Sequence, residues 1–293
     1  MSARTHALPA APRGMALIAV LWIVAALSLM VMGLSATTRV QIHVAATQRD
    51  AASGQAVGDA AIQLALQALL AEPTRPAAAQ RVQVAYQGVE VAVDIAPLDG
   101  LIALNGADAH LFATLLQSAG GLPAAQAQTL AVAIVQWRDT PPSIDPTAAA
   151  AASQPARIES PEDLLLVPGM DYAVYARIAP LVSADLPGGS QINPAAAPPG
   201  VLLALSGGNS AQVAQYIAQR DSGQPGGDAS FLDPRFAAAR AGGGLLYRLQ
   251  ASVPLQAGKI LLLTRDVALE PGATRGLPWR GLRQSRHIVT TAS

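Results

Sequence analysis

The chain contains no cysteine, and Lys259 is its only lysine. Charged residues make up 13% of the 293 positions and aromatic residues 4%. The absence of cysteine excludes disulfides, thiolate nucleophiles and cysteine-ligated metals. Basic and acidic residues number 19 each, so the formal net charge is zero, which argues against broad electrostatic binding of nucleic acid. The sequence also lacks HExxH, GxSxG, GxGxxG and Walker motifs, and its four histidines are scattered. We therefore expect a protein that is not an enzyme and has no catalytic residue.

Apolar residues are abundant, at 51% of the chain, and they form an uncharged run close to the N-terminus. No charge lies between Arg13 and Arg39, and Ser28 is the one hydroxyl residue between Met15 and Met32. As a helix, Met15 to Met32 would measure about 27 Å at ~1.5 Å per residue, which matches the hydrocarbon core of a bilayer. Arg4 and Arg13 precede the run, so the positive-inside bias places the N-terminus in the cytoplasm. The sequence therefore predicts a single membrane pass, with the bulk of the chain exported.

The apolar run has three interpretations. An ordinary signal peptide needs a small-x-small cleavage site soon after the run. Leu34-Ser35-Ala36 begins with a large residue, and Val44-Ala45-Ala46 lies well beyond the run. A plain uncleaved anchor is the second interpretation. The third rests on Arg13-Gly14-Met15, where a short basic leader ends in glycine directly before the apolar helix. This arrangement resembles the leader of type IV pilins and pseudopilins. In that family, prepilin peptidase cuts after the glycine and methylates the new N-terminus, which implies cleavage between Gly14 and Met15.

The helical pattern continues beyond the apolar run and becomes amphipathic. Residues at spacings of three and four share one face: Ile62, Leu66, Leu69 and Leu70. Pro73 and Pro76 end the helix. An apolar helix that continues into an amphipathic one is typical of the pilin stalk. Gly54 and Gly58 form a GxxxG pattern outside the apolar run, and we interpret them as loosely packed positions rather than as a dimerisation motif.

Two β-rich blocks lie far apart in the sequence. Arg81 to Ala96 alternates apolar and polar residues around Gln87-Gly88, which predicts a β-hairpin. A second block alternates from Leu245 to Val253, and a further strand is expected from Lys259 to Leu269. We expect both blocks to share one sheet, with the helical region between them as an insertion.

The region between the β blocks contains a candidate helix-hairpin-helix unit. Ser160 can cap a helix, Pro161 fits the first helical position, and Asp163 completes a capping box. Pro168-Gly169 turns the chain, and Asp171 can cap a second helix. These features predict two short helices joined by a tight turn.

The same region contains an internal duplication. Leu104-Asn105-Gly106-Ala107 and Ile192-Asn193-Pro194-Ala195 each precede an apolar helix, and asparagine suits a turn or cap in both. A Gly-Gly pair follows each of these helices. A further helix then ends in Trp137-Arg138-Asp139 in the first copy and in Arg220-Asp221 in the second. We interpret this pattern as two copies of one small helical unit.

The order of these features resembles the K-type minor pseudopilins of type II secretion systems. The similar stretches are MALIAVLWIVAALSL, LN before a helix, WRD and SPEDLLLVPGM. The resemblance implies an α+β fold, with a pilin-like stalk helix and β-sheet head and an inserted all-α domain of helix-hairpin-helix (SAM-like) repeats. The expected parts are a prepilin-type leader (1–14), a transmembrane and amphipathic stalk helix (15–72), a first β part of the head (80–98), the inserted helical domain (99–242) and a second β part of the head (243–293).

One position distinguishes this chain from most pilin-like proteins. Their fifth mature residue is glutamate, whereas counting from Met15 gives Ala19, and K-type minor pseudopilins typically lack that glutamate. The resemblance implies a subunit that caps the pseudopilus tip and helps to initiate its assembly, for export of folded proteins across the outer membrane. It also implies I- and J-type minor pseudopilins, the major pseudopilin, prepilin peptidase and the inner-membrane secretion platform as partners. The implied location is the bacterial inner membrane, with the C-terminal domain in the periplasm.

The sequence leaves one alternative function open. A membrane-anchored helix-hairpin-helix protein that binds DNA is the alternative, but residues 155–183 carry four acids and two arginines, the reverse of a phosphate-binding hairpin.

Calcium binding is suggested by the resemblance, because relatives with bound calcium are described. The acids near turns are Asp139, Asp145, Asp221, Asp228 and Asp233. Without an EF-hand loop, these acids fit caps and solvated loops better, so we assign no metal ligand and expect no cofactor.

Overall fold

The computed structural model describes residues 13–139, 157–189, 191–222, 227–238, 244–256, 258–270 and 276–290. The greater part of the expected leader and the candidate ligand Asp145 lie outside these ranges. The chain divides into two compact units, residues 1–54 and residues 55–293, and each is described by itself.

The first unit contains most of helix α1 (Arg13–Ala71). Its described apolar side chains are exposed: Leu17, Trp22 and Met30 have exposed fractions of 74%, 73% and 75%. Within the part of the chain that the structure describes, no helix combines the length and the apolar character needed to cross a membrane. The membrane span expected at 15–32 is therefore not confirmed, and the side chains at 15, 16, 29, 31 and 32 lie outside the described residues.

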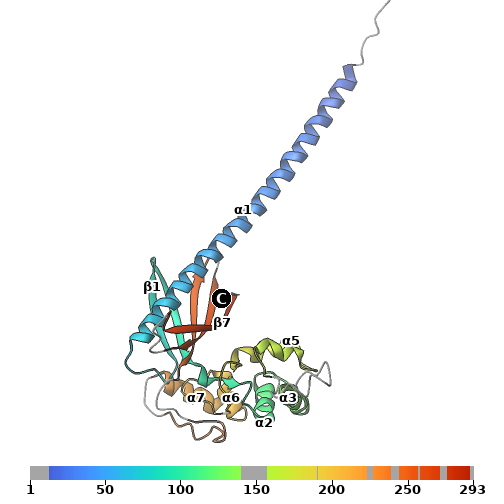
Figure 1. Cartoon of the computed structure of the whole chain (residues 1–293). Helices are drawn as coiled ribbons and strands as arrows, with labels where there is room; N and C mark the ends of the chain where they lie inside the picture. Colours follow the sequence, from blue (N-terminus) through green and yellow to red (C-terminus); the bar gives the residue numbers. More distant parts are fainter. Residues whose placement is uncertain are drawn as a thin grey trace, which may run out of the picture. The chain divides into compact units, whose positions relative to one another are not determined.

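The second unit is built on a five-stranded antiparallel sheet with the order β1-β2-β5-β6-β7 (Figure 1). The strands are β1 (Gln80–Tyr86), β2 (Val89–Pro97), β5 (Leu246–Leu255), β6 (Lys259–Leu269) and β7 (Trp279–Thr290). The predicted hairpin is confirmed, because β1 and β2 pair around Gln87 and Gly88, which have φ angles of 50° and 79°. The predicted shared sheet is also confirmed: Val93 of β2 lies opposite Ala251 of β5.

The sequence pattern does not predict β7. This strand lies at the edge of the sheet and most of its side chains are exposed, so it lacks the alternation of buried and exposed residues that marks β2 and β5. Charged residues along its length, including Arg280 and Arg286, are typical of an edge strand that resists pairing with other chains.

The C-terminal part of α1 packs on one face of this sheet. Ile62, Leu66 and Leu69 are each only 1% exposed, as the amphipathic pattern predicts. They share a core with the inward-facing residues of β2, β5 and β6, among them Val93 and Leu249. Burying this stripe fixes the helix on the sheet through the hydrophobic effect.

Gly58 corrects the prediction of loosely packed glycines. A Cβ atom at Gly58 would overlap Cδ1 of Leu263 and lie 2.9 Å from Cγ2 of Val253. The absence of a side chain therefore lets α1 approach β5 and β6 closely. The sequence could not show this contact, because more than 190 positions separate the glycine from its neighbours.

We expect Gly58→Val to lower the free energy of unfolding by about 1–3 kcal/mol, the usual result of overpacking a core. Urea unfolding of the purified chain measures this effect. Ala56→Val adds the same branched bulk on the exposed side of the helix and serves as the control. Equal stabilities of the two variants would show that the close approach at Gly58 is not a constraint.

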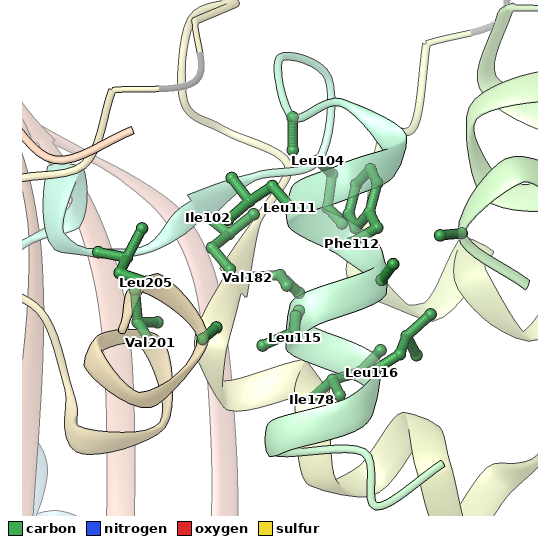
Figure 2. Close-up of a cluster of buried hydrophobic side chains, with 14 of the residues drawn as sticks. Ile102, Leu104, Leu111, Phe112, Leu115, Leu116, Ile178, Val182, Val201 and Leu205 are labelled. Carbon is green, nitrogen blue, oxygen red and sulfur yellow. The ribbon is translucent and has the colours of Figure 1, made fainter. Parts of the chain in front are cut away.

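The insertion between β2 and β5 forms a separate helical core (Figure 1). Its elements are η1 (Leu98–Gly100), β3 (Ile102–Ala103), α2 (Ala109–Ser118), α3 (Ala124–Asp139), η2 (Pro161–Leu166), α5 (Tyr172–Ile178), η3 (Ala179–Leu181), β4 (Val182–Ser183), α6 (Pro199–Leu205) and α7 (Ser210–Asp221). Figure 2 shows the apolar face of α2 directed towards side chains of β3, β4, α5 and α6. β3 and β4 pair in parallel.

The predicted first helix of the helix-hairpin-helix unit is a 3₁₀ helix, η2, and not an α-helix. The carboxylate of Asp163 accepts hydrogen bonds from the backbone N–H groups of Glu159 and Ser160 at 2.9 and 3.0 Å, so its predicted capping role is confirmed. Pro161 and Pro168 bracket the segment, which leaves room only for the short helix type that is common in such connections. The structure does not establish that the inserted units are SAM-like repeats, and this detail stays a prediction.

Candidate functional site

The expected processing site lies in the first turns of α1. Gly14 and Met15 have helical backbone, and their side-chain surroundings lie outside the described residues. Ala19 follows one turn later and is exposed. The structure thus places the three predicted residues on one helix, and the cleavage between Gly14 and Met15 stays a prediction.

The surroundings of Ala19 form an apolar segment, which we define as residues 17–28 and 30. Its large side chains are exposed around the whole helix: Leu17, Ile18, Val20, Leu21, Trp22, Ile23, Val24, Leu27 and Met30. Its polar residue, Ser28, donates its hydroxyl to the carbonyl of Val24 at 2.8 Å, which leaves no free hydroxyl donor. Exposed apolar surface of this extent marks a site covered by lipid or by another protein.

Four of the acids considered as calcium ligands lie in the described ranges, and each of them makes a hydrogen bond or an ion pair within the protein. Asp139 and Asp221 pair with the preceding arginines, at 2.8 and 3.0 Å. Asp233 pairs with Arg235 at 2.6 Å, and hydrogen bonds from Arg235 lower the pKa of Asp233 to about 2. Hydrogen bonds from the side chain and the backbone of Ser230 lower the pKa of Asp228. No three acids or histidines gather into a metal-binding group among the residues that the structure describes.

The two Arg-Asp motifs have a shared structural role. Arg138 donates to the carbonyl oxygens of Leu104 and Ala107, at 3.2 and 2.7 Å. Arg220 donates to the carbonyl oxygen of Ala197 at 2.7 Å. The two arginine side chains are 15% and 16% exposed. In each copy, the arginine that ends the second helix therefore holds the loop that follows the asparagine, which supports the predicted duplication.

A buried ion pair joins the helical insert to the sheet. Arg248 of β5 donates to both carboxylate oxygens of Asp266 of β6, at 2.8 and 2.9 Å. Its third nitrogen donates to the carbonyl oxygen of Pro180, at 2.9 Å. Asp266 is 1% exposed. The sequence analysis does not predict the bond to Pro180, because Arg248 and Pro180 are 68 positions apart and only the folded chain brings them together.

The side chains of two of the four histidines, and the acids of the predicted hairpin, lie in the part of the chain that the structure describes. His110 lies against Phe236, with ring centroids 6.2 Å apart, and His287 lies on exposed β7. His6 and the side chain of His43 lie outside the described residues. The acidic hairpin is partly neutralised from within the protein, because Glu162 pairs with Arg283 at 3.2 Å.

Comparison with known proteins gives one family match. Residues 97–187 match the family described as type II secretion system (T2SS), protein K. No curated protein matches the chain. A chain in the crystal structure of the GspK–GspI–GspJ complex from the enterotoxigenic Escherichia coli type 2 secretion system is similar, with a TM-score of 0.47 and 18% identity. That similarity covers 85% of this chain and 99% of the other. Over residues 97–187, the family match agrees with the predicted resemblance to K-type minor pseudopilins.

Proposed function

Residues 97–187 carry a domain of type II secretion system protein K, and we propose that the chain caps the tip of the pseudopilus and helps to start its assembly. One observation carries the proposal: a whole helical core is inserted between Pro97, the end of β2, and Leu246, the start of β5. A head enlarged in this way would crowd its neighbours inside a close-packed helical filament. At the tip, no subunit lies ahead, so there is room for the enlarged head.

The alanine at residue 19 also supports a place at the tip of the filament. In a pilin filament, the fifth-position glutamate is thought to neutralise the terminal amine of the subunit ahead. Placing an unpaired, ionised carboxylate in lipid costs a free energy of ~2.5–3.5 kcal/mol or more. A tip subunit has no subunit ahead and thus no amine to meet, so an alanine at this position avoids the cost.

The proposed route to the tip begins at the inner membrane. Prepilin peptidase cuts between Gly14 and Met15 and methylates the new N-terminus. The apolar segment keeps the subunit in the membrane in a single pass, with the N-terminus in the cytoplasm and the C-terminal domain in the periplasm. The inner-membrane platform then passes the subunit into the filament. The exposure of this segment's large side chains supports the proposal, because such a surface needs lipid or protein around it.

The proposed partners are I- and J-type minor pseudopilins and, below them, the major pseudopilin. The role is structural and not catalytic. Deletion of the gene, with filament number and export both measured, tests this function. We expect few filaments and a loss of export, both restored by the intact gene. Normal filaments and normal export in the deletion strain would contradict the proposed function.

A further inference from the structure

The two copies of the helical unit use their equivalent asparagines in different ways. In the first copy, Asn105 donates to the carbonyl oxygens of Ile158 and Ala184, at 2.9 and 3.2 Å, and accepts from the N–H of Ile158. All of these partners belong to the insert. This asparagine therefore stabilises the insert from within.

In the second copy, Asn193 makes one bond outside the insert and another to η1, the first element of the insert. Its side-chain amide donates to the carbonyl oxygen of Ala77 at 2.7 Å, in the connection between α1 and β1. Its backbone N–H donates to the carbonyl oxygen of Asp99 at 2.9 Å, where the chain leaves β2. Asn193 is only 1% exposed, so water cannot easily replace these partners.

The backbone next to Asn193 makes further contacts with the same two segments. The N–H of Ala79 donates to the carbonyl oxygen of Ala195 at 3.3 Å. A Cβ atom at Gly100 would overlap the carbonyl carbon of Ala196 and lie 2.7 Å from the nitrogen of Ala197. The loop at 193–197 is thus in direct contact with both the connection between α1 and β1 and the exit from β2.

We propose that the second copy of the helical unit fastens the insert to the sheet, in addition to the contact of Arg248 with Pro180, and that Asn193 is the residue of this copy that positions the insert. We call the contacts of residues 193–197 with residues 77–79 and 98–100 the junction. The inference rests on the proposed function in one respect: at a filament tip, a large insert can present a constant surface only if it does not swing on the sheet. Asn193 acts through the junction and is a positioning residue.

The test is the distance between the sheet and the insert in the full-length chain. The chain has no cysteine, so spin labels attach only at cysteines introduced at Gln83 of β1 and Gln215 of α7, both exposed. Electron–electron double resonance on the detergent-solubilised protein should show one narrow distribution for the parent. Asn193→Asp removes the donor to Ala77 with little change of shape and places a second carboxylate beside Asp99. We expect this variant to lose the narrow distribution.

Asn105→Asp is the matched control, because it makes the same change in the other copy. We expect it to lower the unfolding temperature of the insert and to leave the distance distribution narrow. Gly100→Ala is a second, independent variant that opens the junction at η1, directly after β2, and it should broaden the distribution as Asn193→Asp does. If the distance distribution stays narrow in both junction variants, the second copy does not fasten the insert to the sheet.

The functional consequence is measured separately by export in the native host. We expect Asn193→Asp to lose export at an unchanged protein level, and Ala79→Cys with Ala195→Cys, joined by a thiol cross-linker, to restore it. A broadened distribution with full export would overturn the positioning role. If deletion of the whole gene leaves export intact, the proposed function fails, whereas the distance measurement still decides whether the junction holds the insert.

Discussion

Gly14→Val is expected to abolish processing, so that only the unprocessed chain accumulates. The residue before the cut must fit a narrow peptidase site, and a branched side chain there would prevent the scissile bond from reaching the catalytic groups. Mass spectrometry of the protein from its native host measures the result directly. For the parent chain, the expected N-terminus is an N-methylated Met15.

The control for this experiment is Gly33→Val, the same substitution later in the same apolar run. It should be processed as the parent chain is, because Gly33 lies beyond the residues that enter the peptidase. A parent chain that begins at Thr37 or Thr47 would instead establish an ordinary signal peptide. That outcome would contradict the prepilin interpretation, whatever the effect of Gly14→Val.

Asp266→Asn is expected to lower the free energy of unfolding by about 3 kcal/mol, near the lower end of the range for breaking a buried ion pair. The substitution keeps the shape of the side chain and removes its charge. Arg248, whose side chain is 20% exposed, is then left with a charge that little water can reach. The partial exposure of Arg248 is the reason for expecting the lower end of the range. Denaturant unfolding of the purified chain gives the value.

The exposed pair Arg81–Asp94 provides the matched control. It has the same two-pronged geometry, at 2.6 and 2.9 Å, but its side chains are 65% and 35% exposed. Asp94→Asn should therefore change stability by less than ~1 kcal/mol. The double variant Arg248→Met with Asp266→Leu should recover much of the loss, because it leaves no unpaired charge. If Asp94→Asn proved as damaging as Asp266→Asn, burial would not be the cause.

The sequence predicts those parts of the fold that depend on local periodicity. The hairpin around Gln87-Gly88 and the buried stripe with Ile62 and Leu66 follow from alternation and from spacings of three and four. The shared sheet was predicted from two separate alternating blocks. β7 was not, because both of its faces are largely exposed and its pattern carries no period.

Contacts between distant residues explain the remaining differences. Gly58 looks like a weak helix position in the sequence, and only Leu263 across the sheet shows why a side chain does not fit there. Asn105 and Asn193 look equivalent in the two sequence copies, yet one bonds within the insert and the other outside it. The arginines of the Arg-Asp motifs were noticed as a pattern, whereas their carbonyl partners could be found only in the structure.

If this protein occupies the tip of the pseudopilus, it should be found at one end of an assembled filament, and labelling shows where it lies. Because the chain has no cysteine, a single cysteine at exposed Gln117 of α2 can carry maleimide-linked gold, with the unsubstituted chain as the labelling control. Electron microscopy of pseudopili then gives the position of the label. For a protein that caps the tip, we expect gold at one end of each filament. Gold distributed along the shaft would contradict it.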